Sequence, residues 1–374
     1  MASGQRRLAP LIHAVGQRFD AAKYGLRRAL GGPGPLHIEA YRGYGTTTEL
    51  HLKGRVLEDR GIEPPGEQQS AWKNFRDMLK RVDSREQPYA RLLARFRGVE
   101  QEIQADEEGM FEVTLRLSEP LEEDGGWHPV ELVLLEPRPR GRVEPPVGQG
   151  QVLVPPRTAR FGVISDIDDT VVQTNVTDVL RAARTIMLGS ARTRLPFAGV
   201  APFYRALHAG LPGQPGNPLF FVSNSPWNIY DVLLEFMNLQ GIPPGPVLLR
   251  NWGVYPHEFL PTESRAYKLA QIRPILEMYP HLPFVLVGDS GEEDPEIYAQ
   301  VVAENRDRIL AVYIRDVVPD ADPAIIEELA RQVSAAGSTL VLAADSLVMA
   351  RHAAGQGWIA GDNLPAIQAE VFGL

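Results

Sequence analysis

Apolar and polar residues alternate along much of the chain between residues 36 and 136, with the period of two that is typical of half-buried β-strands. The stretch Asp106–Gly109 between two such runs predicts a hairpin turn, and Ser70–Arg81 predicts a short inserted helix. A small antiparallel β-sandwich is the simplest fold that these strands indicate. The clearest alternating positions are Leu50, Leu52, Phe111, Val113, Leu115, Leu117, Val130, Leu132 and Leu134.

The pattern changes beyond residue 152, where short, fully apolar runs alternate with helical patterns. Fully apolar strands separated by helices indicate a parallel sheet that is covered on both faces. The fold class of this region is therefore α/β with a doubly wound parallel sheet, and catalytic residues should follow the carboxyl ends of its strands. The apolar runs are Phe161–Ile164, Leu219–Val222, Phe284–Val287, Ile309–Ile314 and Thr339–Leu342.

A stretch rich in proline and glycine, Pro137–Pro156, separates the two patterns, and we place the domain boundary inside it. We expect a β-sandwich-like domain with its linker at residues 35–150 and an α/β domain at residues 151–374. A length of 374 residues agrees with two domains, because single hydrophobic cores rarely grow beyond about 250–300 residues.

The first 34 residues predict a basic amphipathic helix. Six arginine or lysine residues against one aspartate give the stretch between Arg6 and Arg28 a net charge of +5. Such a helix can lie in the headgroup region of an anionic membrane, or it can dock on the next domain or on another subunit. Its apolar face would carry Leu8, Leu11, Ile12, Val15, Phe19, Ala22, Leu26 and Leu30.

The composition excludes several classes of function. The chain has no cysteine, so disulfides, thiolate metal sites and a cysteine nucleophile are excluded. A net charge of -9 argues against a broad nucleic-acid-binding surface, which needs clustered lysine and arginine. Apolar runs are too short to span a membrane, and the N-terminus lacks the apolar core of a secretory signal. We therefore expect a cytoplasmic protein whose only membrane contact would be peripheral.

Three aspartates, Asp166, Asp168 and Asp169, follow the first apolar run of the α/β region, and Thr170 comes next. Residues two apart on an extended chain point the same way, so Asp166 and Asp168 can face one ligand. Carboxylates this close repel one another unless a cation neutralises them, and Mg²⁺ is a hard cation that prefers oxygen ligands. The pattern predicts a catalytic metal site. A turn or helix cap built from aspartate and Thr170 is the structural alternative.

Two further segments predict groups that bind a phosphoryl oxygen. Ser223 and Asn224 follow the second apolar run, where a hydroxyl and backbone amides can cradle phosphate, although serine and asparagine before proline also begin helices. Lys268 is the one lysine beyond residue 80 in a chain that otherwise uses arginine. Its retention suggests a site that needs a compact ammonium group, and a solvated helix face is the alternative.

A third apolar run ends before Asp289, with Asp294 five residues further on around a glycine-containing turn. Asp289 would complete the metal site, and Asp294 would hold Lys268 or a metal-bound water in place. The structural alternative is a turn leading into a helix that begins at Asp294 and Pro295, and the two interpretations are compatible.

These four segments, in this order and each at a strand end or on the following helix, resemble the four motifs of the haloacid dehalogenase superfamily. More narrowly, Gly162–Thr170, Val222–Trp227, Gly288–Gly291 and Asp294–Tyr298 resemble the actin-patch-type phosphatidate phosphatase family, over about residues 150–355. The resemblance implies a haloacid-dehalogenase-like Rossmannoid fold for the α/β domain. It also implies a Mg²⁺-dependent hydrolase that converts phosphatidate to diacylglycerol and phosphate.

The resemblance further implies a role for each site residue. Asp166 would be the nucleophile that forms an aspartyl-phosphate, and Asp168 the acid that protonates the leaving oxygen and then deprotonates water. For this role the pKa of Asp168 must lie above its unperturbed value of about 3.9, which burial and a neighbouring carboxylate would favour. The other implied site residues are the phosphate holders Ser223, Asn224 and Lys268, the metal ligands Asp166, Asp289 and the main-chain carbonyl of Asp168, and the supporting residues Thr170 and Asp294.

Several alternatives remain for the substrate. The segments connecting the motifs have room for helices but not for a large cap domain, and an open site suits a lipid headgroup. The same chemistry on a soluble or protein-bound phosphomonoester is the first alternative, and a non-catalytic module that binds a phosphorylated ligand is the second. Trp227, Trp252 and Tyr255 could touch a membrane interface or belong to the core.

Overall fold

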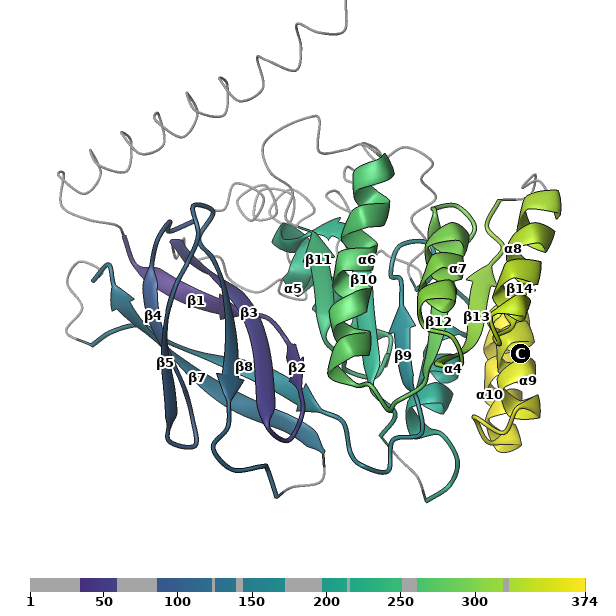
Figure 1. Ribbon diagram of the computed structural model, residues 1–374, viewed down its shortest axis with the longest axis horizontal. Helices are drawn as coiled ribbons and strands as arrows, with labels where there is room; N and C mark the ends of the chain where they lie inside the picture. The colour runs from purple at the N-terminus through teal and green to yellow at the C-terminus, as the bar shows by residue number, and fades with distance from the viewer. Residues whose placement is uncertain are drawn as a thin grey trace, which may run out of the picture.

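The computed structural model of the chain contains an N-terminal β region and a C-terminal α/β region, which lie side by side (Figure 1). The predicted helix at residues 70–81, the predicted basic helix apart from its last residue, and the aromatic residues Trp252 and Tyr255 lie outside the described part of the chain. The described residues are 34–58, 86–122, 125–138, 144–171, 197–213, 216–250, 261–318 and 323–373.

An N-terminal β region comes first. Its strands are arranged in the order β1-β3-β2-β8-β7-β4-β5, with β6 paired to β3. Every pairing except that of β2 with β8 is antiparallel, which confirms the predicted antiparallel region. The strands are β1 (Leu36–Ala40), β2 (Gly43–Gly45), β3 (Glu49–Glu58), β4 (Arg91–Phe96), β5 (Val99–Gln104), β6 (Met110–Arg116), β7 (Gly126–Glu136) and β8 (Val147–Val154).

The sheet of the β region curls around one apolar core. Strands β5 and β6 pair with different neighbours but lie close to each other, so the sheet bends back on itself. Leu52 of β3, Leu92 of β4 and Leu132 of β7 meet in this core. In β6 the buried residues Phe111 and Val113 alternate with less buried ones, as the period of two predicted.

The structure confirms the predicted turn at Asp106–Gly109, but the two strands that flank it do not form the predicted hairpin. The Asp106 carboxylate accepts the N–H groups of Glu108 and Met110, both at 2.9 Å, and Gly109 supplies the positive φ of 72°. The flanking strands do not pair with each other, because β5 pairs with β4 and β6 pairs with β3. The turn therefore carries the chain from one part of the curled sheet to another.

A parallel sheet of six strands forms the second region, in the order β11-β10-β9-β12-β13-β14. Five of these strands coincide with the predicted apolar runs, and β11 was not predicted. The strands are β9 (Gly162–Ser165), β10 (Leu219–Pro226), β11 (Val247–Arg250), β12 (Phe284–Asp289), β13 (Ile309–Arg315) and β14 (Leu340–Ala343).

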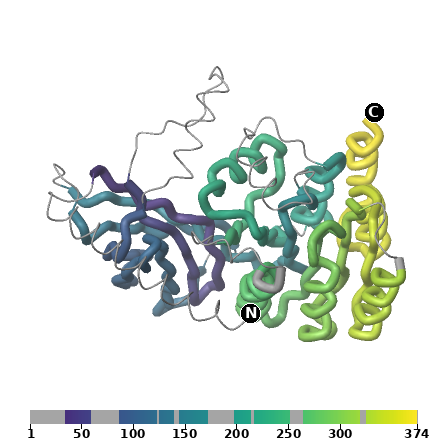
Figure 2. The backbone as a smooth tube through the Cα atoms, turned by 90° about the horizontal axis from the view of Figure 1, so that it is seen from above, coloured from purple at the N-terminus to yellow at the C-terminus, as the bar shows by residue number. Residues whose placement is uncertain are grey.

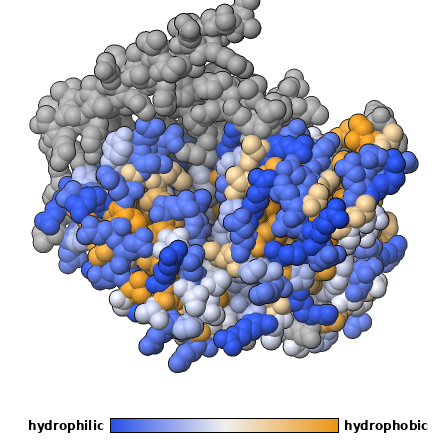
Figure 3. All heavy atoms as spheres, in the orientation of Figure 1, coloured by the Kyte–Doolittle hydropathy of each residue, from blue (hydrophilic) through white to orange (hydrophobic). Residues whose placement is uncertain are grey.

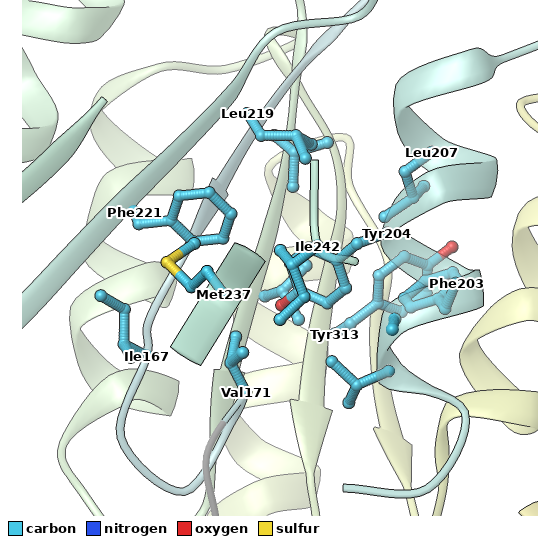
Figure 4. Close-up of a cluster of buried hydrophobic side chains, with 14 of the residues drawn as sticks. Ile167, Val171, Phe203, Tyr204, Leu207, Leu219, Phe221, Met237, Ile242 and Tyr313 are labelled. Atoms are coloured by element: carbon cyan, nitrogen blue, oxygen red, sulfur yellow. The ribbon is translucent and has the colours of Figure 1, made fainter. Parts of the chain in front are cut away.

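Helices cover both faces of the parallel sheet (Figures 1 and 2). Consecutive residues of β9, Val163 and Ile164, belong to two different apolar cores, one on each face. The first core is formed with α4, α5, α9 and α10, and Figure 4 shows Phe203, Leu207 and Met237 within it. The second is formed with α6, α7 and α8. The helices are α4 (Val200–Ala209), α5 (Tyr230–Leu239), α6 (Pro261–Met278), α7 (Asp294–Glu304), α8 (Pro323–Ala335), α9 (Ser346–Gly355) and α10 (Leu364–Phe372).

The β region packs directly against the parallel-sheet region. Tyr41 stacks on Trp227 with ring centroids 3.9 Å apart and an angle of 12° between the rings. The Arg55 guanidinium donates to the Asn228 side chain at 2.9 Å. Trp227 is therefore a buried core residue, the second of its two predicted roles. Since Trp227 and Asn228 follow β10 immediately, the β region contacts the chain just beyond the end of that strand.

The described part of the chain contains no helix that is both long and apolar enough to cross a membrane. Polar side chains cover most of the face of the described residues that Figure 3 shows. Large apolar side chains that reach the surface, among them Tyr89, Leu239 and Ile325, belong to separate segments.

Candidate active site

The candidate site lies where three neighbouring strands of the parallel sheet end. Strand β9 stands between β10 and β12, so its carboxyl end adjoins theirs. Asp166 is the first residue after β9, and its N–H donates to the carbonyl of Val287 in β12 at 2.9 Å. Asp289 is the last residue of β12, and Ser223 lies in the second half of β10. The topology therefore brings together segments that are more than a hundred residues apart in the chain.

Asp166 is buried, with 1% of its surface exposed, and its Oδ1 lies 2.8 Å from the Nζ of Lys268. Burial raises the pKa of Asp166 well above its ordinary value, Lys268 opposes this shift, and the neighbouring carboxylates add to it. Burial and the neighbouring carboxylates thus outweigh Lys268 at this position, and further positive charge nearby would favour the ionised form of Asp166.

Lys268, on α6, is surrounded by carboxylates. Its Nζ lies 2.6 Å from Asp294 Oδ1, 2.8 Å from Asp166 Oδ1 and 2.9 Å from Glu292 Oε2. The ammonium donates hydrogen bonds to Asp294 and Glu292, whereas its contact with Asp166 is an ion pair by distance. Burial lowers the pKa of Lys268, but the carboxylates outweigh burial and hold that pKa well above its ordinary value. Lys268 is therefore a fixed positive charge.

The Asp168 carboxylate turns toward β10. Its Oδ2 accepts hydrogen bonds from Ser223 Oγ at 2.6 Å and from Ser225 Oγ at 2.9 Å. Burial raises the pKa of Asp168, Glu292 adds to this shift, and the two serine hydroxyls oppose it. Ser225 escaped the sequence analysis, although residues two apart on a strand, such as Ser223 and Ser225, point the same way.

The pairing of β10 with β11 is interrupted between Val222 and Pro226, and the Ser225 N–H of this segment makes a hydrogen bond within β10. The Ser225 N–H donates a hydrogen bond to Ser223 Oγ at 2.8 Å, and the Ser223 hydroxyl in turn donates a hydrogen bond to Asp168 Oδ2. In this arrangement Ser223 orients Asp168, a contact that its predicted phosphate-binding role did not include.

Three buried carboxylates form a group that could hold a metal ion. The oxygens of Asp166, Asp289 and Asp294 lie within 4.8 Å of one another. Oxygen donors clustered in this way fit a hard divalent cation, and Lys268 alone does not balance their charge. The predicted ligand set contains the main-chain carbonyl of Asp168, which is independent of the direction of its carboxylate. It does not contain Asp294, which the sequence placed in a supporting role.

Asp289 and Asp294 are held by their own loop. Asp289 Oδ1 accepts the N–H groups of Gly291 at 2.6 Å and of Glu292 at 3.0 Å, and Asp294 Oδ2 accepts the Asp289 N–H at 3.3 Å. Asp294 also begins α7, as predicted. Gly288 makes room for this arrangement, because a Cβ there would lie 2.4 Å from Asp294 Oδ2.

Thr170 and Asp169 shape the loop after β9. The Thr170 hydroxyl is buried and donates to Asp289 Oδ2 at 3.5 Å, a long contact that ties the two strand ends together. Asp169 has a φ of 48°, in the left-handed region that aspartate tolerates better than most residues. The chain forms a turn at Asp169, Thr170 and Val171, directly after Asp168.

Glu292 is a further member of the site that the sequence analysis missed. It lies between β12 and α7, and its Oε2 accepts from Lys268 Nζ at 2.9 Å and from Asn224 Nδ2 at 3.3 Å. Burial would raise the pKa of Glu292, but Lys268 and Asn224 more than offset this and lower it. Nothing in the spacing of Glu292 along the chain distinguishes it from its neighbour Glu293, so only the tertiary structure reveals it.

Comparison with known proteins adds an independent finding. Residues 161–316 match the family described as phosphatidate phosphatase APP1, catalytic domain. The chain is 33% identical over 176 residues to phosphatidate phosphatase APP1 of Saccharomyces cerevisiae, which covers 45% of this chain and 29% of that protein. It is 32% identical over 163 residues to an uncharacterized protein of Schizosaccharomyces pombe, which covers 43% of this chain and 26% of that protein.

The chain thus matches less than a third of the length of these curated relatives. A solved structure, the carbohydrate acetylesterase XAC1771 of Xanthomonas citri, aligns with a TM-score of 0.33 and 13% identity over 88% of this chain and 73% of that chain. A likeness this weak supports no conclusion. The matched segment contains every predicted site residue from Asp166 to Asp294. Residues 161–316 therefore match the APP1-type catalytic domain, which confirms the resemblance that the motifs indicated.

Proposed function

We propose that this chain is a Mg²⁺-dependent phosphatase of the haloacid dehalogenase type that hydrolyses phosphatidate to diacylglycerol and phosphate. The observation that carries the proposal is the buried Asp166 carboxylate at a strand end, 2.8 Å from the ammonium of Lys268. The match of residues 161–316 to a phosphatidate phosphatase catalytic domain supports the substrate class. The parallel sheet covered on both faces supports the fold type.

In the first step a carboxylate oxygen of Asp166 attacks phosphorus. A bond from Asp166 to phosphorus forms while the bond from phosphorus to the alcohol oxygen of the substrate breaks, which leaves an aspartyl-phosphate. Lys268 stays within reach of the transferring phosphoryl group and offsets part of its negative charge. Because Lys268 is buried and satisfied by carboxylates, it is positioned before the substrate arrives.

Asp168 moves the protons of both steps. Its raised pKa favours the protonated acid, which gives its proton to the leaving alcohol oxygen and then accepts a proton from the water that attacks the aspartyl-phosphate. Both serine hydroxyls donate to Oδ2, so the transferable proton resides on Oδ1. Ser223 and Ser225 thereby select which oxygen of Asp168 faces the substrate.

The carboxylates of Asp166, Asp289 and Asp294 would hold Mg²⁺, together with the predicted main-chain carbonyl of Asp168. When bound, the ion supplies positive charge that favours an ionised Asp166 and offsets charge on the phosphoryl group. The fit rests on the buried oxygen cluster itself, whose excess of negative charge Lys268 does not cancel.

Asn224 and Lys268 are the groups best placed to hold phosphoryl oxygens. Both donate to the same oxygen of Glu292, so their donor atoms converge on one point. Ser223 can join them only by turning its hydroxyl away from Asp168, and the hydrogen bond from Ser225 would then remain to hold the acid.

The test is phosphate release by the purified full chain with Mg²⁺, from phosphatidate in mixed micelles and from soluble phosphomonoesters side by side. Release from phosphatidate, abolished in Asp166→Asn, supports the proposal. Release from soluble esters alone would retain the chemistry and reject the lipid. In the lipid case, residues 1–34 would provide peripheral membrane contact, and their deletion should lower activity on micelles more than on soluble esters.

A further inference from the structure

Glu292 contacts both groups that we assign to phosphoryl binding, and it does so through one oxygen. Its Oε2 lies 2.9 Å from Lys268 Nζ and 3.3 Å from Asn224 Nδ2. The two donors come from different elements, the helix α6 and the end of β10, so they converge only at this position. An anionic oxygen that accepts from an ammonium and an amide is also the arrangement that a phosphoryl oxygen would require.

Lys268 donates hydrogen bonds to Asp294 and Glu292, and its ammonium also lies 2.8 Å from Asp166 Oδ1. Since Glu292 Oε2 accepts from both Lys268 and Asn224, a phosphoryl oxygen can take these two donors together only by replacing that oxygen. Asp166 and Asp294 are fixed in the interior, with 1% and 0% of their side chains exposed. The side chain of Glu292 is 36% exposed, so it alone of the three can turn into water without crossing the protein interior.

We propose that Glu292 is an internal competitor for phosphate, whose carboxylate occupies the phosphoryl-binding position in the free enzyme and is displaced when a phosphate group binds. It is thus an affinity-determining residue for the proposed reaction, on which this inference rests. The same carboxylate returns when the reaction is over, and so it favours the release of inorganic phosphate.

A purely structural role for Glu292 would have the opposite consequence. If its function were to hold Lys268 in place, removing its charge would loosen the ammonium and weaken phosphate binding. Two buried carboxylates already hold Lys268, however, at 2.6 and 2.8 Å. The loss of Glu292 should therefore leave the ammonium in position and remove one negative charge from the place where phosphate binds.

The experiment measures the binding of inorganic phosphate to the Mg²⁺-loaded full chain by isothermal titration calorimetry. Glu292→Gln keeps the shape of the side chain and removes its charge, and we expect the dissociation constant to fall about tenfold. Glu296→Gln is the matched control. It removes an equal charge four residues away, and Glu296 is not among the described carboxylates within 4.0 Å of Lys268. Its dissociation constant should equal that of the unaltered chain.

Tighter phosphate binding in Glu292→Gln alone supports the competition, including the case in which the unaltered chain binds phosphate too weakly to measure. Equal or weaker binding in Glu292→Gln, equal tightening in both variants, or no binding in any of them would overturn it. Glu292→Asp, which shortens the reach to Lys268, provides a second measurement if Glu292→Gln does not fold, and it too should bind phosphate more tightly. Since calorimetry requires no turnover, absent phosphate release from phosphatidate would reject the proposed function separately.

Discussion

Two buried cations lie in different surroundings and show what distinguishes a structural contact from a reactive one. Arg55, where the β region meets the parallel-sheet region, pairs with the Glu39 carboxylate and with the neutral Asn228. Lys268, at the strand ends, faces three carboxylates. Among the described ion pairs, Arg55 is balanced by the single carboxylate of Glu39, with a weaker attraction from Glu86, whereas the surroundings of Lys268 carry a larger excess of negative charge. Such an excess is costly in the interior unless a ligand offsets it.

The largest effect should follow from removing the proposed nucleophile. Asp166→Asn leaves the amide in place of the attacking oxygen, and we expect the rate of phosphate release to fall by at least about 10³-fold. Steady-state assays with phosphatidate and Mg²⁺ measure the loss, and circular dichroism checks that the variant is folded. A variant that retains a tenth of the activity would show that Asp166 does not form the covalent intermediate.

The balanced pair should matter for stability rather than for chemistry. Arg55→Met leaves the Glu39 carboxylate, whose side chain is only 16% exposed, without its ion-pair partner, and we expect the free energy of unfolding to fall by about 3 kcal/mol. Urea denaturation measures the change. The matched control is Arg91→Met, because Arg91 is 44% exposed in its pairs with Glu102 and Glu136 and should contribute no more than about 1 kcal/mol.

A double variant separates loss of the pair from loss of packing. Replacing both partners, as Arg55→Met with Glu39→Gln, removes the unpaired charge and should recover part of the stability. If the double variant is as unstable as Arg55→Met, the arginine acts through its packing and its bond to Asn228, and the comparison with Lys268 loses its electrostatic basis.

Mg²⁺ should stabilise the unbalanced site. A concentration of about 100 times its dissociation constant is expected to raise the free energy of unfolding by about 2.7 kcal/mol, seen as a higher melting temperature. Asp289→Asn should reduce or abolish this rise, since Asp289 belongs to the buried carboxylate cluster. Identical melting curves of the unaltered chain with Mg²⁺ and with chelator would argue against a metal site there.

The smallest predicted effect concerns the acid. Burial raises the pKa of Asp168, and the Ser225 hydroxyl opposes this shift. Ser225→Ala should therefore raise that pKa further. Because the acid acts in its protonated form, the fall of kcat/KM at high pH should move to higher pH. A pH profile of both enzymes measures this. A displacement toward lower pH would indicate that the descending limb belongs to another group.

Local patterns were sufficient to predict much of the fold. Alternation in Phe111 and Val113 predicted a half-buried strand, and the apolar runs predicted five of the six parallel strands. Strand β11, Val247–Arg250, was not predicted because only three of its residues are apolar and they follow directly on the turn-forming stretch Pro243–Pro246. The turn at Asp106–Gly109 was predicted correctly because it depends on local residues. The hairpin pairing of its flanking strands was wrong, because β5 pairs with β4 and β6 with β3, and these pairings depend on the tertiary structure of the curled sheet.

The residues of the candidate site likewise divide into those that local sequence patterns predicted and those that they missed. Asp166 and Asp168 stand next to a strand, and the scarcity of lysine drew attention to Lys268, so these residues could be proposed from the chain alone. Ser225 and Glu292 could not, because their importance lies in contacts with Asp168 and Lys268 across the fold. An excess of negative charge around a buried cation depends on the tertiary structure and cannot be predicted from the spacing of residues along the chain.

The stack of Tyr41 on Trp227 has a practical consequence for anyone who shortens this protein. The matched catalytic segment begins at residue 161, after the whole β region. Cutting there would remove the contacts of Tyr41 with Trp227 and of Tyr44 with Phe220, and would expose part of each remaining ring to water. A truncated protein of this kind would expose an apolar aromatic surface close to the proposed phosphate-binding residues Ser223 and Asn224. Low solubility or weak activity of such a fragment would then result from the loss of the β region and not from a defect in the catalytic residues.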